Sequence, residues 1–376
     1  MRLSAENITL FTTENPLLMD CGSSLAPVSV TFETYGELNP EGTNAILICH
    51  ALTGSAHAAD DGSGPENARI NRNPNGPGWW GNAIGKGRAF DPGKYFIISS
   101  NILGSCYGTT GPASTNEKTG GPYRMDFPQM TVRDMVRVEN ALLRRLGVNQ
   151  LVTAAGGSLG GMQALEWAVM YPEMVQSIIP IATVARHTAW GIGLNEVARL
   201  AIMNDPAWEK GNYTEQPVQG LALARMAAMI SYRTASSYEA RFGRQQIADA
   251  EEIRARELFP ATLPGFQIEN YLRYQGQKLI KRFDANTYIY LTRAIDSHDL
   301  AENRAPLKDV LAAIKAQTLC IGISSDILYP PEEQRAITAA VPNGRYAEIK
   351  SVHGHDAFLI EYDQLNGLIG RFLAEI

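Results

Sequence analysis

The chain has 376 residues, of which 45% are hydrophobic and 19% charged, so it contains enough apolar material to bury a large core. Its formal net charge of -6 is not accompanied by a basic block, which argues against nucleic acid or an anionic membrane as a partner. No apolar run is long enough to span a bilayer and residues 1–7 show no signal-peptide pattern, so we expect a cytoplasmic protein.

The first part of the chain predicts strands separated by turns. Residues 8–11 and 28–36 are β-rich, and the second run alternates as a half-exposed antiparallel strand does. Residues 44–50 form a continuous apolar run, which is typical of a strand buried on both faces. A loop of about 40 residues follows, and its length indicates a functional segment or one that wraps over the core. Residues 94–101 are the next predicted strand.

Helices then alternate with strands. Thr131 and Asp134 form a capping-box-like start, and Gly147 ends the helix that they open. Further elements are a strand at 150–153, a helix at 163–170, a strand at 174–182, a strand at 316–323, a helix at about 331–341, a strand at 346–349 and a last helix at about 357–374. This alternation predicts an α/β protein with a mostly parallel central sheet.

The stretch from 187 to 305 interrupts this pattern, because strand-like runs nearly vanish there and helical spacing dominates. We therefore predict a core domain made of residues 1–186 and 306–376, and a helical lid domain of residues 187–305 inserted over the sheet.

A glycine-flanked serine is the centre of the chain. Gly156-Gly157-Ser158-Leu159-Gly160 lies between a strand and a helix, the context that the G-x-S-x-G nucleophile elbow requires. The turn directs the Leu159 N–H toward a developing oxyanion, and Leu52, in the loop after the 44–50 strand, is the candidate for the second donor. The alternative is a glycine-rich turn whose serine has no catalytic role. The presence or absence of a base and a carboxylate for Ser158 distinguishes the two.

A serine nucleophile needs a base, and the base needs an orienting carboxylate. Asp326 follows the 316–323 strand and His355 follows the final strand, so the order Ser158, Asp326, His355 is the one that an α/β-hydrolase fold uses. Taken singly, a loop Asp is by default a turn former and a loop His a solvated surface residue. Their joint position at the ends of successive strands favours a catalytic triad.

Other histidines and the cysteines are assigned by their context. His353 competes with His355, but His355 adjoins the next predicted helix and is favoured. His50 and His57 are interpreted as structural. No histidine has metal-ligand spacing with a second ligand, and the four scattered cysteines contain no Cys-x-x-Cys motif, so we expect reduced thiols and no metal.

Arg225 is the one charged residue in the apolar helical stretch 221–232 of the predicted lid. Two interpretations remain open. The side chain can simply extend to solvent, or it can bind a substrate carboxylate together with Tyr232, which lies seven residues on along the same helix face.

Many segments of the chain are familiar. They are residues 34–39, 50–54, 106–112, 156–167, 195–199, 271–276, 282–286 and 354–359. On these the chain resembles the homoserine O-acetyltransferase family of the α/β-hydrolase superfamily, nearly from end to end. The resemblance implies an α/β-hydrolase fold with a helical lid and Ser158, Asp326 and His355 as the triad. It also implies that Arg225 and Asp356 hold the carboxylate and the ammonium of the substrate amino acid, with Tyr232 nearby.

The resemblance further implies a ping-pong transfer of acetyl from acetyl-CoA to L-homoserine in methionine biosynthesis, without a cofactor, by a homodimer that forms through the lid. Residues 107–110 resemble the acetyl-using members. Trp190 and Gly191 depart from the commoner pattern, which leaves a serine acceptor as an alternative. Succinyl as the transferred group is a further alternative within the family. A carboxylester hydrolase would use the same triad, but it would not need Arg225 and Asp356.

Overall fold

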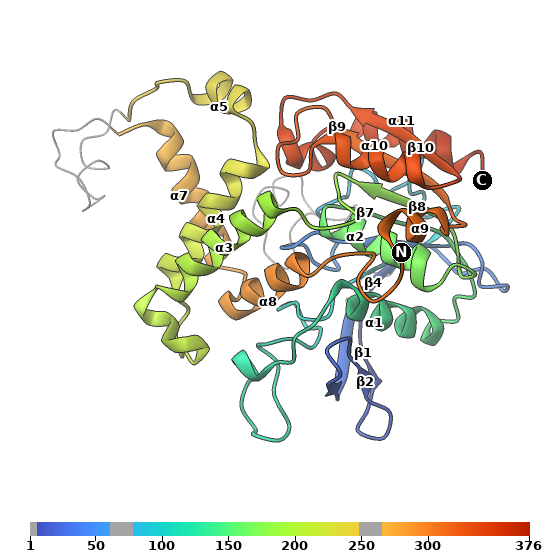
Figure 1. Ribbon diagram of the computed structural model, residues 1–376, viewed down its shortest axis with the longest axis horizontal. Helices are drawn as coiled ribbons and strands as arrows, with labels where there is room; N and C mark the ends of the chain where they lie inside the picture. Colours follow the sequence, from blue (N-terminus) through green and yellow to red (C-terminus); the bar gives the residue numbers. More distant parts are fainter. Residues whose placement is uncertain (1–5, 61–77, 248–264) are drawn as a thin grey trace.

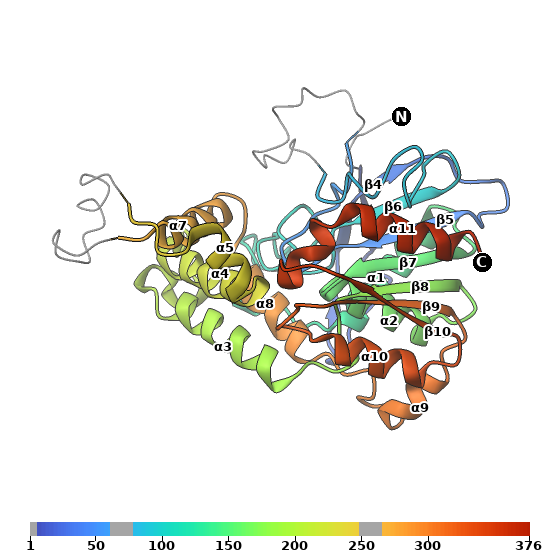
Figure 2. The same ribbon diagram turned by 90° about the horizontal axis from the view of Figure 1, so that it is seen from above.

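The computed structural model describes residues 6–60, 78–247 and 265–376. A sheet with helices on both faces forms one part of the molecule, and a group of helices lies at one end of it (Figures 1 and 2). Most of the N-terminal stretch from which we predicted the absence of a signal peptide lies outside the described residues. So do parts of the predicted long loop and of the predicted lid.

The central sheet has eight strands, and the mostly parallel arrangement predicted from the sequence is confirmed. β1 and β4 pair antiparallel, β4 and β6 also pair antiparallel, and the remaining neighbours are parallel. In spatial order the strands are β1 (Glu6–Phe11), β4 (Val28–Tyr35), β6 (Phe96–Ser100), β5 (Ala45–Cys49), β7 (Leu151–Gly157), β8 (Val175–Ile181), β9 (Gln317–Ile323) and β10 (Gly344–Ile349). A small second sheet pairs β2 (Leu17–Leu18) with β3 (Ser24–Leu25).

Strand β5 explains why the 44–50 run is continuously apolar. Successive residues of a strand point to opposite faces of the sheet. Leu47 belongs to the core on one face and Ile46 and Ile48 to the core on the other, and all three are fully buried. Both faces of this strand are therefore covered by protein.

Helices from different parts of the chain cover the two faces. Residues of α1 (Val132–Arg145), α2 (Leu159–Met170), α9 (Leu307–Ala312) and α10 (Pro331–Ala340) pack into one core, and those of α11 (Tyr362–Leu373) into the other. Residues 78–90 also pack on the α11 face, where the fully buried Trp80 donates its indole N–H to the Phe358 carbonyl at 3.1 Å. The described end of the predicted long loop therefore wraps over the core, which is one of the two predicted alternatives.

The ends of α1 follow from local sequence. The Thr131 side chain accepts from the Asp134 amide, and the Asp134 carboxylate accepts from the Thr131 amide, which is the predicted capping box. After the helix, Gly147 has a φ of +82°, a left-handed conformation that favours glycine and ends the helix.

Two predicted boundaries were wrong. Strand β7 continues past residue 153 to Gly157, so it runs directly into Ser158. The predicted last helix is divided into a 3-10 helix, η4 (Gly354–Leu359), and α11. The non-helical backbone of Ile360 and Glu361 separates them, and η4 carries His355 as a buried residue.

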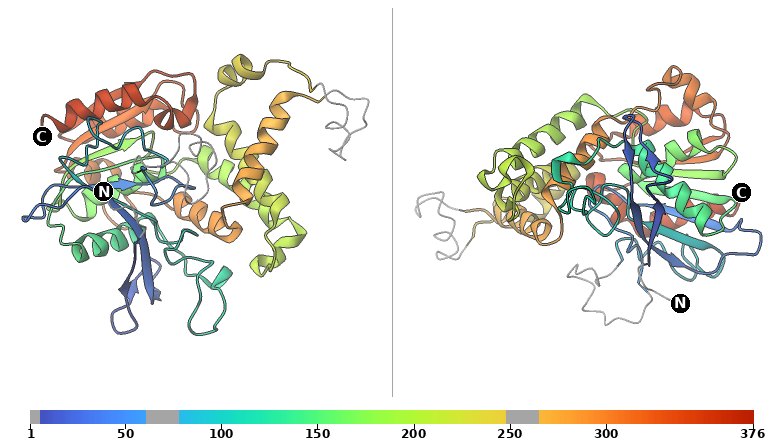
Figure 3. Two further views of the ribbon diagram at one scale, coloured as in Figure 1. Left: turned by 180° about the vertical axis from the view of Figure 1, so that it is seen from behind. Right: turned by 90° about the horizontal axis from the view of Figure 1, so that it is seen from below.

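The chain between the core strands β8 and β9 is helical. The elements are α3 (Ala189–Met203), the 3-10 helix η3 (Pro206–Gly211), α4 (Val218–Tyr232), α5 (Ala235–Phe242), α7 (Gln267–Ile280) and α8 (Ala285–Asp296). In every view α3, α4, α5 and α7 lie together beside the core (Figures 1 and 3). No helix within the described ranges is long and apolar enough to cross a membrane.

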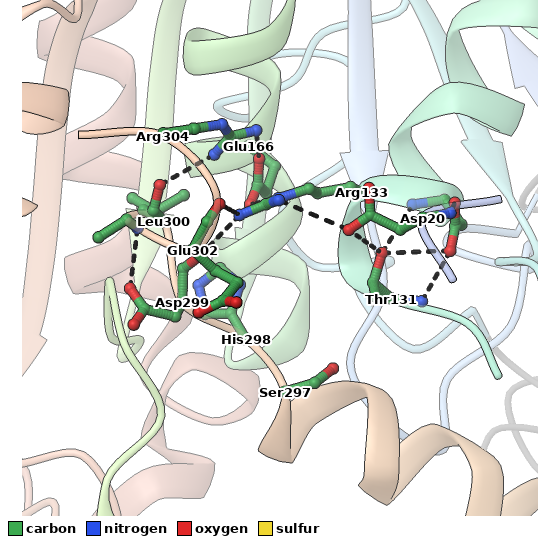
Figure 4. Close-up of polar contacts among 12 residues, drawn as sticks. Asp20, Thr131, Arg133, Glu166, Ser297, His298, Asp299, Leu300, Glu302 and Arg304 are labelled. Atoms are coloured by element: carbon green, nitrogen blue, oxygen red, sulfur yellow. Dashed lines mark hydrogen bonds and ion pairs between the residues drawn. The ribbon is translucent and has the colours of Figure 1, made fainter. Parts of the chain in front are cut away.

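A buried ionic network fastens the chain where it returns from these helices to the core (Figure 4). Arg133 donates from Nη2 to the carbonyls of Asp299 (2.9 Å) and Glu302 (2.6 Å), and from Nε to Glu166 (3.2 Å). Arg304 donates to the other Glu166 oxygen at 2.6 Å. Glu166 is 1% exposed, so these two guanidinium groups take the place of water around its carboxylate.

Candidate active site

Ser158 occupies a sharp turn between β7 and α2. Its φ of +59° and ψ of -121° are unusual for a residue with a side chain. Its amide donates to the Ile181 carbonyl at 2.9 Å, which anchors the turn to strand β8. Such strain persists only where neighbouring structure holds the residue, and it is typical of functional sites.

The glycines on either side of the turn are required by close packing. A Cβ atom added to Gly156 or to Gly160 would overlap the carbonyl oxygen of Cys49 on strand β5. Because that oxygen belongs to the backbone of a central strand, it cannot move aside cheaply. The motif Gly-x-Ser-x-Gly thus lets β5, β7 and α2 approach closely at the serine.

Asp326 and His355 form a direct contact. His355 Nδ1 lies 2.7 Å from Asp326 Oδ2, and both side chains are almost fully buried. The other carboxylate oxygen accepts from the amides of Leu328 (2.8 Å) and Tyr329 (3.0 Å), which fixes its orientation. The carboxylate therefore faces His355 with one oxygen and its own loop with the other.

Charges around His355 favour its protonated form. Burial alone would lower its pKa, but the charge and hydrogen bond of Asp326, with a contribution from the charge of Asp356, raise the pKa above its usual value of 6.5. An imidazole of this kind can take a proton from a hydroxyl and stabilise the resulting positive charge next to the carboxylate.

His353, the alternative, does not share this contact. It precedes η4, and its imidazole forms no hydrogen bond with another described residue. The structure thus joins His355, and not His353, to Asp326.

Aromatic rings connect His355 to the serine turn. The His355 ring lies against Tyr232 (centroids 5.8 Å apart), Tyr329 (5.2 Å) and Phe358 (5.9 Å). Phe358 in turn packs so close to Gly157 that a Cβ there would meet its ring at 2.5 Å. The imidazole and Ser158 therefore lie on neighbouring parts of one small region.

A pocket opens at this region between the core and α3, α4 and α8. Among the residues that line it are Leu52, Ser158, His187, Tyr232, Tyr288 and Tyr329. Burial raises the pKa of Tyr232 and Tyr329, so both phenols stay neutral in the physiological range. The pocket is thus bounded by the serine and by neutral hydroxyl groups.

Of the two predicted oxyanion donors, Leu52 lines this pocket, and Leu159 directly follows Ser158, which also lines it. Within the described part of the chain, the amide of neither residue has a hydrogen-bond acceptor. The loop that carries Leu52 is held on two sides, since Gln163 donates to the His50 carbonyl at 3.2 Å and Arg282 donates to the Thr53 carbonyl at 2.8 Å. Two free amides on fixed backbone are what an oxyanion hole requires.

The predicted amino-acid clamp lies beside the pocket. The Arg225 guanidinium carbon is 5.6 Å from the centroid of the Tyr232 ring, and Arg225 forms no ion pair with a described residue. Asp356 follows His355, but its Oδ2 is 3.2 Å from the Nε of Arg233. The sequence analysis missed Arg233 because nothing in the local pattern distinguishes it from a solvated arginine at a helix end.

His50 and His57 contact backbone groups or a carboxylate outside the pocket. His50 is fully buried, its Nδ1 lies 2.8 Å from the Ala51 carbonyl, and its Nε2 accepts from the Ile102 amide at 3.2 Å. Burial lowers the pKa of His50 to about 4, so it stays neutral. His57 lies 3.0 Å from Glu33. No group of three or more His, Cys, Asp or Glu residues in the described ranges could hold a metal ion.

The chain is similar to known proteins along almost its whole length. A sequence profile of the alpha/beta hydrolase fold matches residues 44–362. The homoserine O-acetyltransferase of Carboxydothermus hydrogenoformans is 50% identical over 363 residues, which cover 95% of this chain and 92% of that protein. Two solved structures are also similar. The homoserine O-acetyltransferase of Bacillus anthracis has a TM-score of 0.86 and 29% identity and covers 99% of this chain and 98% of its own. Esterase E22 has a TM-score of 0.85 and 30% identity, with 98% and 99% covered.

Proposed function

Since the chain belongs to the homoserine O-acetyltransferase family of the α/β-hydrolase fold, whose members are acyltransferases, we propose that it transfers an acetyl group from acetyl-CoA to the hydroxyl of L-homoserine. The observation that carries the proposal is the 2.7 Å contact between Asp326 and His355 beside a pocket lined by Ser158. The product, an acylated homoserine, would serve methionine biosynthesis.

The first half-reaction acylates the serine. His355 takes the proton of the Ser158 hydroxyl while the serine oxygen attacks the thioester carbonyl of acetyl-CoA. The negative charge on that carbonyl oxygen is stabilised by the amides of Leu52 and Leu159. The carbon–sulfur bond breaks, His355 returns the proton to the sulfur, and CoA leaves. Acetyl-CoA is a substrate here, and no cofactor takes part.

The second half-reaction reverses these roles. His355 takes the proton of the homoserine hydroxyl, whose oxygen attacks the acetyl-serine, and Ser158 leaves with that proton. Arg225 would hold the substrate carboxylate, because its guanidinium has no ion-pair partner among the described residues. Asp356 would hold the ammonium group, sharing its charge with Arg233.

A carboxylester hydrolase is the second candidate, because the structure of esterase E22 is as similar to this chain as that of the Bacillus anthracis transferase. Water would then replace homoserine as the acceptor. Arg225 and Asp356 favour the transferase, since a hydrolase has no need of two opposite charges beside the acyl-serine.

The experiment is an assay of CoA release. The protein is mixed with acetyl-CoA or succinyl-CoA, and homoserine, serine or water alone serves as the acceptor. We expect fast turnover with acetyl-CoA and homoserine, and a single burst of CoA without acceptor. Mass spectrometry of the burst product should show one acetyl group on Ser158, and Ser158→Ala should lose several orders of magnitude in rate while keeping its thermal transition. Equal turnover with water and homoserine would favour the hydrolase.

We also propose a homodimer that forms through the lid. Large apolar side chains are exposed on two neighbouring helices, Trp190, Val197 and Leu200 on α3 and Leu223 and Ile230 on α4. Exposed apolar groups of this kind favour a protein interface. Light scattering at several concentrations tests this, and a monomer at all of them would contradict it.

The cysteines support a cytoplasmic location, which we include in the proposal. All four are free, and Cys49 and Cys320 are buried in the central sheet. Burial raises the pKa of both thiols, so they stay protonated and unreactive. Free thiols of this kind are typical of a reducing compartment.

A further inference from the structure

His187 is a buried histidine to which the proposed steps give no role. It lies just before α3, is 6% exposed, and lines the pocket together with Ser158 and Tyr329. Its Nε2 is 3.1 Å from the Tyr329 hydroxyl, and its Nδ1 is 3.3 Å from Asp296 Oδ1. An imidazole with a carboxylate at one nitrogen and a phenol at the other has a defined orientation.

Asp296 faces Nδ1 of His187. Its carboxylate accepts from the Asn195 amide group at 2.8 Å and lies 2.7 Å from Arg199 Nη1. These partners and His187 outweigh burial and lower the pKa of Asp296, so it is a carboxylate. With the proton on Nδ1, His187 faces this carboxylate, and in that tautomer Nε2 can accept from the Tyr329 hydroxyl.

Tyr329 contacts two members of the proposed triad, Asp326 and His355. Its amide donates to Asp326 Oδ1 at 3.0 Å. Its ring packs edge-on against His355, with centroids 5.2 Å apart and an interplanar angle of 81°. A residue that fixes the Tyr329 hydroxyl thus also fixes a common neighbour of the carboxylate and the imidazole.

Gly191 makes room for His187. A Cβ at this position would overlap Nε2 of His187 and lie 2.7 Å from its Cε1. The Gly191 amide donates to the Thr188 hydroxyl at 3.2 Å, which holds the first turn of α3 in place. Trp190, the neighbouring departure from the family pattern, is 56% exposed and is not among the residues that line the pocket.

We propose that His187 is a positioning residue for acyl transfer, which holds Tyr329 against Asp326 and His355, and that the absence of a side chain at Gly191 accommodates it. The proposal rests on the proposed function only in that it takes Ser158 as the nucleophile. It connects the first turn of α3, through His187 and Tyr329, to Asp326 and His355.

The first experiment compares His187→Leu with His187→Gln. Leucine cannot accept the Tyr329 hydroxyl proton, whereas the glutamine amide oxygen can. We expect kcat for acetyl transfer to fall about 10- to 100-fold in His187→Leu, because a small displacement of reacting groups has effects of this size, and to fall less in His187→Gln. The reaction of Ser158 with a fluorophosphonate should slow in parallel, and the NMR signal of the His355 Nδ1 proton should move.

The second experiment uses a matched pair of glycines in α3. Alanine is favoured over glycine in a helix at both positions. A Cβ on Gly191 meets His187, whereas a Cβ on the exposed Gly193 meets nothing within 4 Å. Gly191→Ala should lose activity and Gly193→Ala should keep it. In a His187→Leu background, Gly191→Ala should cost much less than it does alone, since the two residues are coupled.

The outcomes separate the two proposals. Absence of acetyl transfer by the wild-type protein would contradict the proposed function, while fluorophosphonate labelling would still test His187. Unchanged labelling rates and an unmoved His355 proton signal in folded His187→Leu would overturn the positioning role. Equal losses in Gly191→Ala and Gly193→Ala would overturn the role of Gly191.

Discussion

Replacement of Asp326 by asparagine tests the orientation of His355 with almost no change in shape. One Asp326 oxygen accepts from two amides, at 2.8 and 3.0 Å, and the other faces His355 Nδ1 at 2.7 Å. The asparagine oxygen would keep the two amides, which turns its NH₂ group toward His355. An NH₂ group only donates, so Nδ1 would have to accept and the proton would move to Nε2. His355 could then not take the proton of Ser158.

We expect kcat of Asp326→Asn to fall about 10⁴-fold, which corresponds to about 5.5 kcal/mol of activation free energy. The assay is CoA release from acetyl-CoA with homoserine, together with the burst measured without acceptor, because both half-reactions use His355. Circular dichroism and the thermal transition control for folding. Activity within about tenfold of the wild type would refute the reasoning, since the tautomer would then not matter.

The pH profile gives an independent readout. Asp326 raises the pKa of His355 against the opposing influence of burial. The acidic limb of kcat/KM should therefore lie above pH 6.5 in the wild type and move to lower pH in Asp326→Asn. The same raised pKa stabilises the fold at pH values below the unfolded pKa of His355. This contribution is lost as the pH rises through its folded pKa.

Substitutions at four other positions test the remaining assignments. His355→Ala should abolish both half-reactions and His353→Ala should retain most of the rate; the opposite result would move the triad by two residues. Arg225→Ala should lower kcat/KM for homoserine about 10- to 150-fold, or about 1.5–3 kcal/mol, with little effect on the CoA burst, and Arg225→Lys should recover little. A burst that falls equally would assign Arg225 to the acyl donor or to lid packing. Glu166→Ala should lower the free energy of unfolding by about 3 kcal/mol in a denaturant titration, because two arginines lose their buried partner; an unchanged midpoint would contradict this.

Local sequence determined much of the architecture. The apolar run at 44–50 predicts a strand covered on both faces because every residue of β5 is buried, whichever way it points. The spacing of Thr131, Asp134 and Gly147 predicts α1 because capping and termination act over a few residues. Gly156 and Gly160 mark the serine turn in the sequence, but the close approach that requires them is to the carbonyl oxygen of Cys49 on the distant strand β5.

Contacts between distant residues were decided only by the tertiary structure. Asp326 and His355 are 29 residues apart, and they meet because β9 and β10 are parallel neighbours whose carboxyl ends lie side by side. The sequence favoured His355 over His353 only because His355 adjoins the predicted last helix, and it did not predict the 3-10 helix that buries His355. The contact of His187 with Tyr329 spans 142 residues and depends on how the helix after β8 packs over the loop after β9. Such pairings follow from strand order and helix packing, which local sequence patterns do not encode.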